Sequence, residues 1–246
     1  MWVDTHCHLQ LLDVDPDALL DRADKVDWVV APGVDLDSSV AALALSRRRT
    51  DVLASAGLHP HDAEHWPSQV DGIAALLPNV SAVGETGLDY YRNLAPQDKQ
   101  RQSFGAQIDL AIEFDLPLIV HCRDAFADVH AMLEKYAAGP RAVLHCWTGG
   151  TRWTKRFLEL GVMFSFAGPV AFETGETIRL GAALVPPERA LVETDTPYLS
   201  PPPHRGEHNE PAHVQYVGQT LAKVWSLDVA EVARQTSENA RTVFHS

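Results

Sequence analysis

Short runs of apolar and β-branched residues recur along the chain, and each has about the length of a buried strand. Longer stretches separate these runs, and in them apolar residues return every three or four positions, as on one face of a helix. This pattern predicts strands at residues 2–8, 28–34, 52–59, 80–86, 116–122, 142–147, 162–167 and 190–195. It predicts helices at residues 18–23, 38–47, 97–114, 125–136, 153–160, 174–184, 213–225 and 229–244.

Strands and helices that alternate in this way are typical of a parallel (β/α)8 barrel, the TIM barrel. The chain has 246 residues, of which 46% are hydrophobic, and this fits one domain of the size that such a barrel needs. The proline cluster at 201–203 follows a predicted strand, so we interpret it as a stiff loop rather than a linker between domains. We therefore expect one α/β domain that covers residues 1–246.

Side chains of the kinds that bind divalent metals stand at the ends of the predicted strands. They are His6, His8, Glu85, His121, His145 and Asp195. Because side chains alternate along a strand, the His-x-His pair points both imidazoles to the same face. The carboxyl ends of all strands meet at one rim of a barrel, so we expect the whole set to lie together there. The sequence therefore predicts a metal-dependent enzyme.

Charge and cysteine content narrow the range of partners. The formal net charge of −13 argues against a large basic surface of the kind that grips duplex nucleic acid, so any nucleic acid is expected to be held locally, as an end or a single strand. We interpret Cys7, Cys122 and Cys146, each beside a predicted ligand histidine, as small buried residues that face the helical layer, not as disulfides or metal ligands. This fits a reducing compartment.

Nothing in the sequence predicts a membrane segment. No apolar run approaches the roughly 20 residues that a membrane helix needs, and the first residues lack the basic start and apolar core of a signal peptide. We therefore expect a cytoplasmic monomer with no membrane partner and no obligate protein partner.

Eight short motifs, taken in order, resemble the TatD family of metal-dependent deoxyribonucleases, which belongs to the amidohydrolase-like barrels. They are DTHCHL at the start, GLHPHDA at 57–63, GETGLDYYR at 84–92, QDKQRQSF at 97–104, IVHCRDA at 119–125, LHCWTG at 144–149, ETDTPYLSP at 193–201 and NEP at 209–211. An isolated His-x-His motif is weak, but the ordered set covers most of the chain and is specific.

This resemblance implies a barrel hydrolase with two divalent metal ions, for which magnesium, manganese and zinc are all candidates. One ion would lie among His6, His8, Glu85 and Asp195, and the other among Glu85, His121 and His145. Glu85 then serves both ions, which agrees with its chemistry, because a carboxylate has two oxygens and is able to bridge cations about 3.5–4 Å apart.

Asp195 and Glu85 are the candidate catalytic residues. A carboxylate that touches both the metal and the attacking water is able to take the proton of the water and return it to the leaving oxygen, and we assign this role to Asp195. The alternative for Asp195 is a helix cap, and the alternative for each histidine is a buried, hydrogen-bonded core residue. Asp4 precedes the histidine pair on the same face and is expected to orient one imidazole.

Four basic side chains are candidates for substrate binding: His59, Arg123, Arg205 and His208. Arg123 follows His121 by two residues and is the candidate phosphate clamp, with a solvated surface arginine as the alternative. His59 also ends a predicted strand, although a turn histidine is an open alternative. The family usually has a second arginine in an R-G-x-R-N-E-P loop, whereas this chain has His208, which cannot make the same bidentate fork.

Aromatic residues follow several of the predicted ligand strands, at Tyr90, Tyr91, Trp147 and Tyr198. They are candidates for stacking on nucleobases, although aromatic rings at loop starts more often fill the top of the core. Trp147 stands where the family usually has phenylalanine, and we expect its larger ring to narrow the pocket.

Three functions remain open from the sequence. The first is a phosphodiesterase that acts on DNA, as an exonuclease on ends or single strands. The second is an esterase, amidase or deacylase of the amidohydrolase type, for example an aminoacyl-tRNA deacylase or a small-molecule hydrolase, because the same activated water attacks carbonyl carbon or phosphorus. The third is a non-catalytic barrel with a structural metal, which the absence of a cysteine-rich four-ligand set disfavours.

Overall fold

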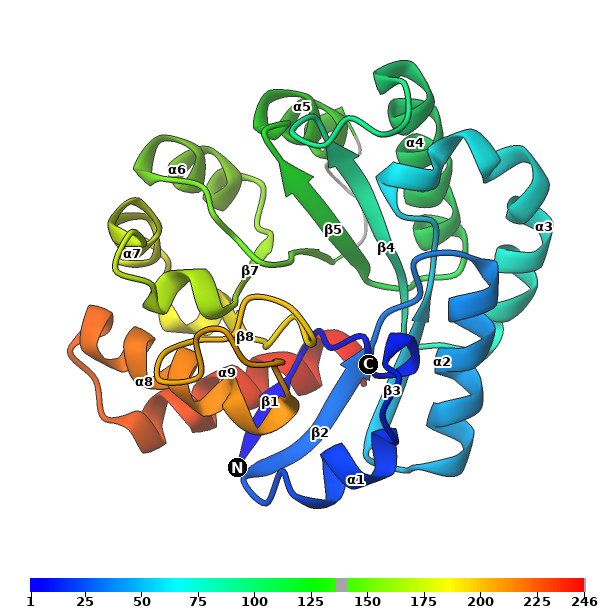
Figure 1. Cartoon of the computed structure of the whole chain (residues 1–246). Helices are drawn as coiled ribbons and strands as arrows, with labels where there is room; N and C mark the ends of the chain where they lie inside the picture. Colours follow the sequence, from blue (N-terminus) through cyan, green and yellow to red (C-terminus); the bar gives the residue numbers. More distant parts are fainter. Residues whose placement is uncertain (136–140, 246) are drawn as a thin grey trace.

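The computed structural model describes residues 1–135 and 141–245, and it confirms the (β/α)8 barrel (Figure 1). The strands form one parallel sheet in chain order. They are β1 (Trp2–Asp4), β2 (Val26–Ala31), β3 (Val52–Ala56), β4 (Ala82–Asp89), β5 (Leu118–Arg123), β6 (Ala142–Leu144), β7 (Met163–Phe166) and β8 (Ala190–Val192). This arrangement brings the carboxyl ends of all the strands to one rim.

The helices form the outer layer of the barrel (Figure 1). They are α1 (Pro16–Asp21), α2 (Leu36–Arg48), α3 (Trp66–Leu76), α4 (Gln97–Glu113), α5 (Phe126–Lys135), α6 (Thr151–Glu159), α7 (Glu176–Ala182), α8 (Val214–Trp225) and α9 (Val229–Phe244). The sequence analysis missed α3, whose pattern is interrupted by Pro67 and Gly72. The helix predicted at 125–136 ends on Tyr136, which lies outside the described residues. The domain predicted at 1–246 ends on Ser246, which also lies outside them.

Several strands are shorter than predicted, and this changes where the metal donors sit. β1 ends at Asp4, β6 at Leu144 and β8 at Val192. His6, His8, His145 and Asp195 therefore lie on the loops that follow these strands, whereas Glu85 and His121 lie within β4 and β5. Cys146 and Asp195 have φ angles of 44° and 58°, so the chain has left the extended conformation at both positions.

Backbone hydrogen bonds between the loops after β1 and β8 close the barrel. The amide of Thr5 donates to Val192 (3.1 Å), that of Asp195 to His6 (2.9 Å) and that of His8 to Thr196 (2.8 Å). Because these bonds interleave the two loops, they place the His-x-His pair directly beside Asp195.

The buried carboxylate of Asp4 strengthens this closure. It accepts hydrogen bonds from the backbone amide of Thr194 (2.9 Å) and from its hydroxyl (2.6 Å). It also accepts from the backbone amide of His6 (3.3 Å), and within residues 1–135 and 141–245 no hydrogen bond joins it to an imidazole. The expectation that Asp4 orients an imidazole ring is therefore wrong, because its carboxylate bonds to the loops after β1 and β8 instead.

Trp147 fills the core rather than the pocket. Its side chain is buried, its indole N–H donates to the hydroxyl of Thr154 (3.0 Å), and its ring packs edge to face against Phe157 and Phe164. The expectation that it narrows the pocket is therefore wrong. The helical layer in residues 1–135 and 141–245 includes no helix with the length and apolar character needed to cross a bilayer.

Candidate metal centre

Four of the predicted donors form a first cluster at the rim. The Nε2 atoms of His6 and His8 lie 3.2 Å apart, and they lie 3.3 and 3.5 Å from Oε2 of Glu85. Oδ1 of Asp195 is 3.8 Å from Nε2 of His6 and 3.6 Å from Nε2 of His8. The two nitrogens and two oxygens thus surround one small volume.

The other oxygen of Glu85 takes part in a second cluster. Its Oε1 lies 2.9 Å from Nδ1 of His121 and 3.0 Å from Nε2 of His145, and these two nitrogens are 3.3 Å apart. His59 adds a further nitrogen, since its Nε2 is 3.4 Å from the same oxygen. One carboxylate therefore faces both clusters, one oxygen to each.

The electrostatics of the clusters favour positive charge at their centre. Burial alone would raise the pKa of Glu85, but the charge of His145 and hydrogen bonds from His121 and His145 hold this pKa well below its ordinary value. Burial likewise opposes protonation of His145, yet Glu85 and Glu193 raise its pKa well above the usual range. Protons and divalent cations both supply the positive charge that these side chains favour.

The donor set fits divalent cations. The facing pair of Nε2 atoms in the first cluster carries either a proton or a cation between them, because two lone pairs repel at this distance. The Nδ1 atoms of both rings are buried without a hydrogen-bond partner in the described chain, and each carries the ring proton when Nε2 offers its lone pair to a cation. Imidazole and carboxylate donors suit zinc, manganese and related ions. Three groups of side chains in the described chain are close enough to share an ion: His6, His8 and Asp195; His59, Glu85 and His121; and His6, His145 and Glu193.

Two further carboxylates, which the sequence analysis missed, hold the histidines of the second cluster. Oε1 of Glu193 lies 3.1 Å from Nδ1 of His145, and Oδ2 of Asp89 lies 3.2 Å from Nε2 of His121. Asp89 also contacts Nε2 of His61 (2.9 Å). A carboxylate on the far nitrogen fixes the ring and makes its other nitrogen a better metal ligand. The signal was present, since both residues stand beside predicted ligands in the ETD and GLD motifs.

Two of the four predicted substrate contacts lie at the clusters. Burial lowers the pKa of His59 to about 4, so this ring is neutral at pH 7 and sits against Glu85. The guanidinium of Arg123 lies over the ring of Tyr91, 4.1 Å from its centroid. Its side chain lines two cavities at the rim of the barrel. Stacking fixes the plane of this cation while leaving its N–H edge available.

The other two lie in the loop after β8 and line neither cavity. Arg205 lies over the ring of Phe172, 3.9 Å from its centroid, and donates to the carbonyl of Ser200 (3.0 Å). His208 is exposed to solvent. The structure thus brings Arg123 and His59 to the donors, whereas Arg205 is engaged in the packing of its own loop.

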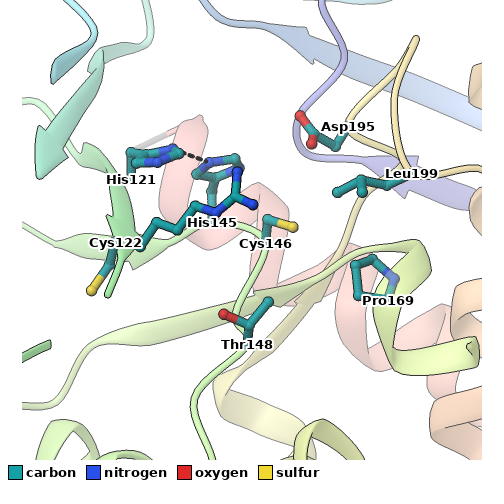
Figure 2. Close-up of a pocket in the computed structure, with 9 residues that line it drawn as sticks. His121, Cys122, His145, Cys146, Thr148, Pro169, Asp195 and Leu199 are labelled. Carbon is teal, nitrogen blue, oxygen red and sulfur yellow. Dashed lines mark hydrogen bonds between the residues drawn. The ribbon is translucent and has the colours of Figure 1, made fainter. Parts of the chain in front are cut away.

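Two adjoining cavities are lined by the donors. The smaller has a volume of about 230 Å³ and the larger about 440 Å³. They share the side chains of His121, Arg123, His145, Asp195 and Leu199. Figure 2 shows residues that line the smaller cavity, among them Asp195 and His145. A substrate that spans the metal donors therefore has two unequal spaces for its two halves.

The cysteines differ from expectation in one respect. All three are free thiols, and Cys7 is buried as predicted. Cys122 and Cys146 are only half-buried, and both line the smaller cavity. The strand alternation on which the prediction rested ends before Cys146, where φ turns positive.

Of the four tyrosine and tryptophan candidates, two have exposed rings near the larger cavity. Tyr91 is 63% exposed and Tyr198 is 56% exposed, and Tyr198 lines that cavity. The hydroxyl of Tyr90 donates to Asp128 (2.6 Å), which anchors that ring to α5.

A nearly closed parallel barrel with histidine and carboxylate donors gathered at its carboxyl-terminal rim is typical of metal-dependent hydrolases. Comparison with known proteins gives the family. A family model described as "TatD related DNase" matches residues 3–245. The chain therefore belongs to the TatD family, as the motifs indicated, and it is a metal-dependent hydrolase of that family.

Curated relatives of similar length support this assignment. The chain is 38% identical to "Uncharacterized metal-dependent hydrolase YcfH" of Escherichia coli, over 99% of this chain and 95% of that protein. It is 35% identical to "3'-5' ssDNA/RNA exonuclease TatD" of Salmonella typhimurium, over 89% of this chain and 88% of that protein. Among solved structures, the TatD homologue YJJV of Escherichia coli superposes with a TM-score of 0.94 at 27% identity, covering 100% of this chain and 98% of the other.

Proposed function

We propose that the protein is a two-metal phosphodiesterase that removes nucleotides from the 3′ end of single-stranded DNA or RNA. The proposal depends on the position of Glu85, because its two carboxylate oxygens face two separate donor clusters. Two cations held close together would stabilise both the attacking and the leaving oxygen of an in-line displacement at phosphorus. The printed names of relatives such as the Salmonella exonuclease support the choice of substrate and of strand end.

The chain's own residues supply both ion sites in this proposal. His6, His8, Glu85 and Asp195 would hold one ion, and Glu85, His121 and His145 would hold the other. When bound, the cations lower the pKa of a water molecule and neutralise the charge that develops on the phosphate. Magnesium, manganese and zinc are the candidates, since the donor set suits each of them.

Asp195 is the general base of the proposed reaction. A hydrogen bond from His8 and nearby imidazoles outweigh the effect of burial and keep its pKa below the ordinary value, so it is ready to accept a proton. The water oxygen forms a bond to phosphorus, the bond from phosphorus to the sugar oxygen breaks, and the proton held by Asp195 passes to that leaving oxygen. Water is consumed and no other reactant is needed.

Arg123 and His59 position the phosphate. The guanidinium of Arg123, stacked on Tyr91, lines both cavities, and its fork of N–H groups would match two phosphate oxygens. His59, neutral at pH 7, is placed to donate a hydrogen bond from the other side of Glu85. Arg123 also favours a phosphate over a carbonyl substrate, because a fork of donors pairs with two oxygens of one charged group.

We further propose that one chain acts alone, in a reducing compartment such as the cytoplasm. All six predicted ligands come from a single chain, so no partner subunit is needed to complete the site. The free cysteines beside the ligand histidines are compatible with reducing conditions.

The test is trimming of a 5′-labelled single-stranded oligonucleotide by protein freed of metal with a chelator and resupplied with magnesium, manganese or zinc. Shortening that needs metal and falls at least 100-fold in Asp195→Asn supports the proposal. The matched control is Asp24→Asn, at an exposed aspartate, which should trim at the native rate. No shortening with any of the metals, together with cleavage of an aminoacyl ester or a simple carboxylic ester, would assign the site to deacylation instead.

A further inference from the structure

Helix α6 carries a group of positive side chains on the outer layer of the barrel, between α5 and α7 (Figure 1). Arg152, Lys155 and Arg156 are all exposed, and their spacing of three and four residues puts them on one face of the helix. The opposite face is buried through Thr154 and Phe157. The basic face of α6, defined by these three cations, is therefore turned to solvent.

No counter-ion in the described chain neutralises this basic face. None of its cations forms an ion pair within residues 1–135 and 141–245, whereas Arg48 pairs with Asp17 and Arg101 pairs with Asp128 on other helices. The chain has 33 acidic and 20 basic side chains, so carboxylates are plentiful elsewhere. Like charges held close together raise the free energy of the protein, and a bound polyanion would lower it. The basic face therefore favours an anionic ligand.

The half-buried indole of Trp153 holds two of these cations in place. The guanidinium carbon of Arg156 lies 4.9 Å from the ring centroid and that of Arg152 lies 5.4 Å from it, within the range of a cation–π contact. The ring is itself anchored, because it stacks on Phe126 of α5 with centroids 5.9 Å apart. No hydrogen bond from either guanidinium to the described residues occupies its N–H groups. These groups are able to pair with phosphate oxygens.

The basic face begins close to the loop that lines the smaller cavity. Thr148 is exposed and lines that cavity together with Arg123 and three of the metal donors. Helix α6 starts three residues later, at Thr151, and Arg152 lies in its first turn. Because the helix that follows a barrel strand runs back from the rim along the outside of the barrel, α6 leads away from the donors. The basic face is therefore adjacent to the candidate metal centre but separate from it.

We infer that the basic face of α6 is a second binding surface for single-stranded nucleic acid, which holds backbone phosphates away from the bond that is cut. The inference rests on the proposed phosphodiesterase function. Arg152 and Arg156 bind phosphates through their N–H groups, and Lys155 adds a third charge. Three cations on a helix of nine residues match the row of phosphates on one strand, and the acidic remainder of the chain disfavours a duplex. Phosphate contacts of this kind carry no preference for base sequence.

The experiment compares two substrates of the metal-loaded protein, a single strand of about 20 thymidine nucleotides and the dinucleotide of thymidine. The dinucleotide has a single phosphate, which is the one cleaved, so it leaves no phosphate for α6. At low salt we expect kcat/KM for the long strand to exceed that for the dinucleotide by about tenfold or more, because only the long strand makes the additional phosphate contacts. Equal values for the two substrates overturn the inference.

A triple variant, Arg152→Ala with Lys155→Ala and Arg156→Ala, removes the basic face. Alanine favours a helix, so this variant is expected to fold. Its preference for the long strand should fall about tenfold, while its kcat/KM on the dinucleotide stays at the native value, which also shows that it is folded. For the long strand, the slope of log kcat/KM against log salt should become shallower by about 2, the value for three phosphate contacts of about 0.7 each.

A second triple variant controls for the change in net charge. Arg47→Ala with Lys99→Ala and Lys223→Ala also removes three exposed cations, but from α2, α4 and α8. It should keep the native preference for the long strand, because its charge is lost from other helices. An equal loss of preference in both triple variants, or an undiminished preference in the α6 variant, overturns the inference.

The dinucleotide separates contacts at the metal donors from contacts at α6. On this substrate Arg123→Ala should remain slow, whereas Arg156→Ala should be as fast as the native protein, so the two arginines are best compared on it. Cleavage of both substrates with equal kcat/KM overturns the α6 surface and leaves the proposed function standing. If neither substrate is cleaved with any metal, the proposed function fails, and fluorescence anisotropy of a dye-labelled long strand tests the surface by itself. Weaker binding by the α6 variant than by the control variant then supports the surface, and equal binding overturns it.

Discussion

Oε1 of Glu193 lies 3.1 Å from Nδ1 of His145, and the same oxygen accepts the backbone amide of Cys146 at 2.8 Å. The Glu193 side chain is fully buried, so this contact is protected from water. With Nδ1 bonded in this way, the Nε2 atom of His145 is turned toward Glu85 at 3.0 Å. Glu193 therefore decides which nitrogen of His145 is offered to a metal ion.

Replacing Glu193 with glutamine tests this role. The amide oxygen still accepts a hydrogen bond, but it no longer carries the charge that makes His145 a stronger ligand. We expect the affinity of the second cluster, which contains His145, for a divalent ion to fall about 10- to 100-fold, as is usual when such a partner is lost. Titration of the chelated protein with zinc, followed by calorimetry, measures the change. Glu188→Gln, at an exposed glutamate, is the control and should bind as the native protein does.

Arg123 is predicted to act through its charge and its fork of donors. Arg123→Ala should lower kcat/KM on single-stranded DNA by about 10- to 100-fold, the range for loss of a hydrogen bond to a charged group. The slope of log affinity against log salt should become shallower by about 0.7, the value for one phosphate contact on a single strand.

Arg156→Ala is the matched control for this prediction, because Arg156 also lies over an aromatic ring, that of Trp153, but on the outer helix α6. An equal effect of the two substitutions would show that Arg123 has no special contact with the substrate. Arg123→Lys should recover part of the salt dependence but little of kcat/KM, since lysine keeps the charge without the fork.

The loop after β8 should respond to pH through His213. This ring stacks on His204 with centroids 3.8 Å apart, and its Nδ1 lies 3.0 Å from Oδ1 of Asn209. The Asn209 amide in turn donates to the carbonyls of Thr194 and Tyr198, next to Asp195. Burial and the neighbouring His204 lower the pKa of His213 from its ordinary 6.5. The folded chain thus binds this proton less readily than the unfolded chain, and stability is lost as the pH falls below about 6.5.

The measurement is the difference in Tm between pH 8 and pH 5.5. Between these pH values the Tm of the native protein should fall further than the Tm of His213→Gln, by roughly 2–4 °C. A shift of this size corresponds to about 1 kcal/mol in a chain of this size. Glutamine is able to donate to Asn209 but does not titrate, and the other histidines contribute equally to both proteins. An identical loss in the two proteins would remove His213 as the cause.

The sequence predicted the barrel and its donor set because both depend on periodicity. Strand alternation put His6 and His8 on one face, and the common rim of a parallel barrel brought Glu85 and Asp195 to them, as the distances between these side chains now show. The pattern does not record where a strand stops. Asp195 and Cys146 lie beyond their strands with positive φ, and the prediction that Cys146 faces the helices failed for this reason.

The pattern of hydrophobic and polar residues also does not predict contacts between distant loops. Asp4 was expected to orient an imidazole, but its carboxylate instead bonds to Thr194, 190 positions along the chain. Nothing local in the sequence signals that pairing. The same holds for Arg205, whose place over Phe172 depends on how two loops fold against each other.

The most direct test of the account is the number of divalent ions bound per chain, measured together with the rate of trimming on the same samples. The native protein should bind two ions. Glu85→Gln should lose high-affinity binding at both clusters and trim at least 1000-fold more slowly, because one carboxylate serves both ions and activates the water through them. Glu188→Gln should match the native protein. A Glu85→Gln protein that keeps two ions and the native rate would contradict the shared-carboxylate centre on which the proposed chemistry depends.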